Sequence, residues 1–166
     1  MSTTISRRSF LTKMGTLSGL MAGGAIIAAC GGGSATQAPA AKTEGGAVTL
    51  EIASKGEELL FDKDKLEASA GSKITLKFKN NSSALMHNWV LVKPGTGDAV
   101  AADGLAAGEV KGYLKENDDR VIAHTNMVKA GETVSITFNA LAAGAYPYIC
   151  TYPGHNFLMK GTLTIK

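Results

Sequence analysis

The chain has 166 residues, of which 17 are Lys or Arg and 14 are Asp or Glu. Three of the basic residues, Arg7, Arg8 and Lys13, lie within the first 29 positions, so the rest of the chain holds 14 basic and 14 acidic residues and has no net charge. This balance excludes nucleic-acid binding through a basic surface.

Residues 1–29 predict an export signal. Residues 6–11 read Ser-Arg-Arg-Ser-Phe-Leu, a twin-arginine motif, and residues 14–29 are uncharged and mildly apolar. A bilayer span needs about 20 apolar residues, so this stretch fits the apolar part of a signal peptide better. Residues 27–30, Ile-Ala-Ala-Cys, resemble a lipobox, which predicts a lipidated Cys30 at the mature N-terminus. An uncleaved membrane anchor is the alternative, and both interpretations place the folded part outside the cytoplasm and tethered to a membrane.

Residues 30–46 are expected to form a flexible tether behind the lipidated cysteine. They consist mainly of Gly, Ala, Ser and Pro, with only Lys42 and Glu44 charged, and cannot bury a core. A linker of this kind has a root-mean-square reach of about 20–25 Å.

Residues 47–166 predict one all-β domain. Alternation of apolar and polar residues indicates strands at 48–52, 73–79, 133–138 and 161–165, each with one buried face. Gly-containing turns follow at 70–72, 129–132 and 142–144. The Ala-rich segment 98–110 predicts one short helix, interrupted near Gly104. A domain of this length with seven or eight strands is expected to form a β-sandwich.

A metal-binding pattern ends the chain. Cys150, His155 and Met159 follow one another at spacings of five and four residues, and His87 begins an apolar segment upstream. One thiolate, two imidazoles and a weak thioether form the ligand set of a type 1 copper electron-transfer centre. An unpaired Cys150 in an oxidising compartment is tolerated if a metal holds it.

Zinc is the competing metal, but structural zinc sites prefer four Cys or His ligands and catalytic ones keep a water, so the thioether favours copper. The third histidine, His124, lacks a partner at ligand spacing and is interpreted as structural or exposed. Met86 and Met127 are interpreted as packing residues. Pro153 and Gly154 predict the turn that brings His155 back towards Cys150, and the N–H of Tyr152 can donate to the sulfur.

Three segments, at 86–90, 120–125 and 150–166, resemble the azurin and auracyanin branch of the cupredoxins, most of all the membrane-tethered auracyanins. The resemblance implies an eight-stranded Greek-key sandwich with a helical flap, one copper ion per chain and one-electron carriage. It makes His87, Cys150 and His155 equatorial ligands and Met159 the axial one.

The same resemblance implies roles for the residues around the metal. The backbone N–H of Asn88 is expected to donate to the sulfur while its side chain braces the loop near Thr151, and Trp89 matches a buried core tryptophan. Azurins have Gly where this chain has Met86, so a weak contact from the Met86 carbonyl is an open question. The azurin disulfide is absent, since no cysteines remain to form it.

The sequence therefore predicts a non-enzymatic, monomeric electron carrier. Its expected partners are redox proteins, such as c-type cytochromes, a quinol-oxidising complex or a photosynthetic reaction centre. The side chains of Tyr152, Pro153, Phe157 and Leu158 are expected to surround an exposed edge of His155 and to form the docking patch. A copper enzyme and a copper chaperone are the alternatives. Three histidines and one domain are too few for a copper enzyme. A closed four-ligand site suits keeping the copper rather than passing it on, as a chaperone must.

Overall fold

The structure, a computed structural model, describes residues 46–166. The predicted export signal, Cys30 and all but the last residue of the predicted tether lie outside the described residues. No helix among residues 46–166 is both long and apolar enough to cross a membrane.

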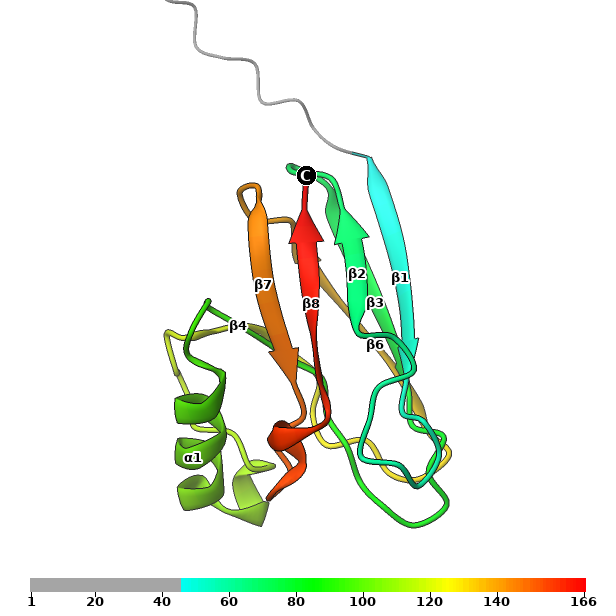
Figure 1. The fold of residues 1–166 in the computed structure, drawn as a ribbon, viewed down its shortest axis with the longest axis vertical. Coiled ribbons are helices and arrows are strands. Elements are labelled where there is room, and N and C mark those ends of the chain that lie inside the picture. Colours follow the sequence, from blue (N-terminus) through cyan, green and yellow to red (C-terminus); the bar gives the residue numbers. More distant parts are fainter. Residues whose placement is uncertain (1–45) are drawn as a thin grey trace, which may run out of the picture. The chain divides into compact units, whose positions relative to one another are not determined.

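Within residues 46–166, eight strands form two sheets, as predicted (Figure 1). The first sheet has the order β1-β3-β6, with β1 (Ala47–Ala53), β3 (Lys73–Lys79) and β6 (Thr133–Asn139). The second has the order β2-β8-β7-β4-β5, with β2 (Lys65–Ala68), β8 (Lys160–Ile165), β7 (Gly144–Ile149), β4 (Val90–Val92) and β5 (Val121–His124). β1 runs parallel to β3 and β2 parallel to β8, while the other neighbours are antiparallel.

The core lies between the sheets and is built by the predicted alternation. Ile74, Leu76 and Phe78 of β3 are completely buried, and β8 contributes Leu163 and Ile165 from the opposite sheet. Burying each such side chain contributes roughly 1.5–3 kcal/mol. The four predicted strands are confirmed to within one residue at each end, and β1 is longer than predicted by one residue at both ends.

Aromatic rings fill the centre of this core. Trp89 is completely buried, and its ring lies 6.0 Å from Phe138 and 5.6 Å from Tyr148, measured between centroids. Trp89 comes immediately before β4, so its packing fixes the start of that strand and the two residues that precede it, His87 and Asn88.

The described part of the chain has one short α-helix, α1 (Gly97–Ala107), followed by a 3₁₀ turn, η1 (Glu109–Lys111). The predicted interruption near Gly104 is wrong, because the helix continues through this residue and ends before Gly108, which has φ of +79°. Gly104 serves a packing purpose instead: a Cβ there would lie 2.2 Å from the carbonyl oxygen of Tyr113. The glycine therefore lets the segment after η1 pack directly against the helix.

The termini of the domain and its ligand loop lie at opposite ends. The beginning of β1 and the C-terminus lie at one end, and the loop between β7 and β8 lies at the other, beside α1 and η1 (Figure 1). The second end holds every element that contributes to the site described next.

Candidate metal centre

The loop of residues 150–159 joins two paired strands and is closed by its own hydrogen bonds. Ile149 pairs with Lys160, and the N–H of Cys150 donates to the carbonyl of Met159 at 3.0 Å. Within the loop, the N–H of His155 donates to the carbonyl of Tyr152 at 2.9 Å. Gly154 has φ of +79°, a conformation that favours glycine. The predicted turn at 153–154 thus reverses the chain and brings His155 over Cys150.

His87 is held by backbone pairing on the facing segment. Its N–H donates to the carbonyl of Val128 at 3.2 Å, and the N–H of Val128 donates back to the carbonyl of His87 at 2.8 Å. Because β4 begins three residues later, His87 is fixed on both sides. The imidazole therefore faces the loop with little freedom.

Three donor atoms converge in the interior. Cys150 Sγ lies 3.8 Å from His87 Nδ1 and 3.7 Å from His155 Nδ1, and the two Nδ1 atoms are 3.2 Å apart. His87 and Cys150 are completely buried and His155 is 5% exposed. Metal–sulfur and metal–nitrogen bonds of about 2.3 and 2.0 Å, at angles of about 110–120°, separate such donors by about 3.3–3.7 Å. One ion fits among the three atoms, and this is the one such group of His, Cys and carboxylate side chains within residues 46–166.

Burial keeps all three groups uncharged when no metal is bound. It lowers the pKa of His87 to about 4, an effect that the neighbouring His155 reinforces, and it also lowers the pKa of His155. Burial raises the pKa of Cys150 to about 11, although backbone N–H groups of Asn88 and Tyr152 donate to the sulfur and oppose the rise. The imidazoles are thus ready to bind a metal, whereas binding through sulfur must release a proton.

The side chain of Asn88 joins the two halves of the site. Its Nδ2 donates to Thr151 Oγ1 and its Oδ1 accepts from the N–H of Thr151, both at 2.8 Å. Both residues are about 1% exposed. This pair ties the residue after His87 to the residue after Cys150, which fixes the separation of the two donors.

The structure separates the remaining candidates into buried and exposed positions. Met159 is completely buried at the end of the loop, whereas Met86 is half-buried immediately before His87. Met127 is also half-buried, outside the cluster. His124 is exposed, and its Nδ1 lies 3.2 Å from the carbonyl oxygen of its neighbour Thr125, so this histidine is not part of the cluster.

The surface over the cluster is apolar. Phe157 is 70% and Leu158 61% exposed, while Tyr152 and Pro153 are half-buried. The ring of Tyr152 lies 4.6 Å from that of His155, measured between centroids, and covers it. With only 5% of His155 exposed, the solvent-accessible edge of this imidazole is smaller than the sequence led us to expect.

Tyr113, which the sequence did not single out, contacts Tyr152 edge to face, with a centroid distance of 5.2 Å. It follows the flap made by α1 and η1, and nothing in its sequence context marks it, because flap and loop lie far apart along the chain. The flap also carries two exposed apolar side chains, Leu105 and Val110.

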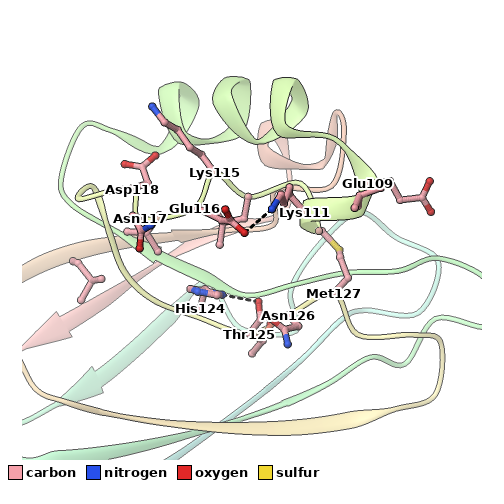
Figure 2. A pocket seen from close by; sticks show the side chains of 15 residues that line it. Glu109, Lys111, Lys115, Glu116, Asn117, Asp118, His124, Thr125, Asn126 and Met127 are labelled. Carbon is pink, nitrogen blue, oxygen red and sulfur yellow. Dashed lines mark hydrogen bonds and ion pairs between the residues drawn. The ribbon is translucent and has the colours of Figure 1, made fainter.

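A groove of about 1050 Å³ lies between the segment after η1 and β5 (Figure 2). Its lining is largely polar, and Lys111 and Glu116 form an ion pair across part of it at 2.7 Å. His124 lies on its floor, opposite that pair. The groove does not include any of the three donor residues, so it is separate from the metal cluster.

A two-sheet β-sandwich that buries a His–Cys–His cluster at one end has the architecture of a cupredoxin. Residues 48–166 match the profile of the copper binding proteins of the plastocyanin/azurin family, and the chain belongs to that family. It is therefore a blue copper protein of a non-enzymatic, electron-carrying family, and the predicted fold class and copper cofactor are confirmed.

Individual relatives agree with this assignment. Auracyanin-A of Chloroflexus aurantiacus is 47% identical over 157 residues, which cover 93% of this chain and 97% of that protein. The solved structure of auracyanin A, a "blue" copper protein from the same bacterium, has a TM-score of 0.69 and 50% identity, covering 72% of this chain and 99% of that one. An azurin of Pseudomonas fluorescens biotype C is 42% identical over 118 residues, or 66% of this chain and 92% of that protein.

Proposed function

We propose that this protein carries single electrons between membrane redox complexes or cytochromes on the outer side of the cytoplasmic membrane. The observation that carries the proposal is the convergence of Cys150 Sγ, His87 Nδ1 and His155 Nδ1 within 4.8 Å of one another in a buried cluster. We assign these three as equatorial copper ligands and Met159, buried at the end of the same loop, as the axial one.

Bound copper supplies the exchange of one electron between its two oxidation states, and the protein keeps the donors in place during that exchange. The Asn88–Thr151 pair and the Cys150–Met159 backbone bond hold the loop against the segment of His87. The N–H groups of Asn88 and Tyr152 donate to the sulfur and stabilise its negative charge. A buried, hydrogen-bonded site of this kind has little room to rearrange, which favours fast electron transfer.

We place the path for electrons at His155, beneath the apolar patch of Tyr152, Pro153, Phe157 and Leu158. Two of these side chains are more than half exposed, and exposed apolar patches mark docking sites. The absence of net charge on residues 30–166 predicts weak long-range steering. Suitable partners are c-type cytochromes, a quinol-oxidising complex or a photosynthetic reaction centre. We propose that this protein docks to each of them as a monomer.

For the location, we propose export by the twin-arginine route and anchoring through lipidated Cys30, with residues 31–46 as the tether. The motifs at 6–11 and 27–30 support this. The match to auracyanin-A spans 157 residues, more than residues 46–166 contain, so it includes part of the segment that carries these motifs. Cys30→Ser should release soluble, still blue protein; a variant that stays in the membrane fraction would favour an uncleaved anchor.

The visible spectrum of the purified protein tests the main proposal. The oxidised protein should bind one copper per chain and absorb strongly through charge transfer from thiolate to copper, and Cys150→Ser should abolish the colour even if copper still binds. Colour retained in Cys150→Ser would remove Cys150 from the site. A colourless wild-type protein with bound metal would instead favour a chaperone or storage role. The electron paramagnetic resonance spectrum of the same oxidised protein tests whether the Met86 carbonyl also approaches the metal.

A further inference from the structure

Glu57, in the loop between β1 and β2, is tied to the segment that leads into His87. Its two carboxylate oxygens accept the hydroxyl of Ser82 at 3.1 and 3.0 Å, and Oε1 also accepts the N–H of Ser83. Ser82 Oγ in turn accepts the N–H groups of Ala84 at 3.1 Å and Leu85 at 2.7 Å. The hydroxyl thereby uses its donor and both acceptor positions.

Asn80 completes this arrangement from the interior. It is completely buried, and its Nδ2 donates to the carbonyl of Leu85 at 2.8 Å and to that of Val128 at 2.9 Å. Its Oδ1 accepts from Ser54 Oγ at 2.9 Å and from the N–H of Ser82 at 3.0 Å. The side chain therefore satisfies all of its hydrogen-bonding positions with fixed partners.

The partners of Asn80 are the two backbones that border the first histidine. Leu85 lies two residues before His87, and Val128 is the residue that pairs with His87 through two backbone hydrogen bonds. Glu57, Ser82 and Asn80, which we name the clasp, thus join three separate loops around one imidazole. None of the three residues contacts the metal cluster directly.

We infer that the clasp is a positioning device for His87, and that the fixed negative charge of Glu57 lowers the reduction potential of the copper centre. The inference rests on the proposed role of His87 as a copper ligand. A carboxylate held near the ion stabilises the more positive, oxidised state over the reduced one. No other acidic side chain within residues 46–166 takes part in the hydrogen bonds of the clasp.

The electrostatic surroundings support this charge. Hydrogen bonds from Ser83 and Ser82 lower the pKa of Glu57, so the carboxyl is ionised at neutral pH. Glu57 itself is exposed, so its effect on the copper should weaken as salt screens it.

Glu57→Gln tests the charge with little change in shape, because the amide oxygen can still accept from Ser83. The matched control is Glu58→Gln, the same change one residue later, in a side chain that is 57% exposed and pairs with Lys55 on the surface at 2.8 Å. Voltammetry should give a higher reduction potential for Glu57→Gln, a clearly smaller shift for Glu58→Gln, and a difference that shrinks at high ionic strength. Equal shifts in the two variants would overturn the electrostatic part of the inference.

The positioning role is tested in the metal-free protein by amide hydrogen exchange. Glu57→Ala removes the acceptor of the Ser82 hydroxyl and of the Ser83 N–H, and should speed amide exchange at Leu85 and His87 by at least about fivefold to tenfold, the effect expected from losing a single hydrogen bond. Glu57→Gln should restore slow exchange, and Glu58→Ala should not change it. Unchanged exchange in Glu57→Ala would overturn the positioning role. A wild-type protein that is not blue would refute the proposed function. A blue protein whose Glu57 variants change neither the reduction potential nor amide exchange would refute only the inference about the clasp.

Discussion

The contribution of the Asn88–Thr151 pair to the stability of the site can be measured without copper. Thr151→Val keeps the shape of the side chain but removes the hydroxyl, which leaves the buried Nδ2 of Asn88 without its acceptor. An unsatisfied buried donor costs about 1–3 kcal/mol. Asn88→Ala removes both hydrogen bonds, strands the N–H and hydroxyl of Thr151 and opens a small cavity, for an expected loss of about 2–5 kcal/mol.

The two variants and their combination form a double-mutant cycle. Urea unfolding of the metal-free protein, at a pH where both histidines are neutral, gives the free energy of unfolding of each. In the Asn88→Ala background the hydroxyl of Thr151 has already lost its partner, so Thr151→Val should cost little or even stabilise. The coupling energy should be about 1–3 kcal/mol, as for residues in one hydrogen-bonded network.

Additive losses would refute this reasoning, because they would mean that the two side chains contribute independently. Ser135 on β6 supplies a control position: it is exposed, and the side-chain hydrogen bonds of residues 46–166 do not include it. Ser135→Ala should change stability by less than about 0.5 kcal/mol. A comparable loss there would show that the assay reports general damage to the sandwich rather than the pair.

Three further predictions concern the metal, the partner and pH. Met159→Leu should raise the reduction potential and Met159→Gln should lower it, because a thioether is a weak donor that modestly stabilises oxidised copper; voltammetry without a change in either variant would exclude Met159 as the axial ligand. Leu158→Glu should slow electron transfer to a soluble c-type cytochrome in stopped-flow measurements, with only a slight dependence on ionic strength in the wild type; a steep salt dependence with an indifferent variant would place docking on a charged face. Hydrogen bonds from Arg120 lower the pKa of Asp118 from 3.8 to about 2. The stability that these bonds provide is therefore present above pH 4 and is lost as the pH falls towards 2. In urea unfolding, Asp118→Asn should flatten this part of the dependence of the unfolding free energy on pH.

Local patterns were enough to predict the half-buried strands. β3 and β6 alternate strictly because one face meets the core and the other meets water, which is the condition under which period-two patterns are readable. β2 has only four residues, and β7 contains Gly144 and Pro147, residues that are depleted in strands. Pro147 is tolerated because β4 pairs only with Tyr148 and Ile149, so the proline lies beyond the part of β7 that is paired on both sides.

The candidate site likewise has a part that the sequence predicts and a part that only the structure reveals. The spacing of Cys150, His155 and Met159 is a local property of one loop, and the sequence alone could indicate a copper centre there. Gly104 misled the helix prediction, because its role is to admit the carbonyl of Tyr113, which only the folded chain brings close. The link from Glu57 through Ser82 to Asn80 joins residues up to 25 positions apart without a repeating pattern, so only the three-dimensional arrangement reveals it.

The chain enters its first strand at the pole opposite the metal. β1 begins at Ala47 beside the start of β3, and its seven residues run towards the end where the ligand loop lies, a length of about 23 Å at 3.3 Å per residue (Figure 1). The proposed attachment through the segment before Ala47 would therefore act at the end of the domain opposite the ligand loop. The ligand loop would then stay accessible to partners. Shortening the segment before Ala47 should restrict how far the domain can move from the membrane without changing the copper centre.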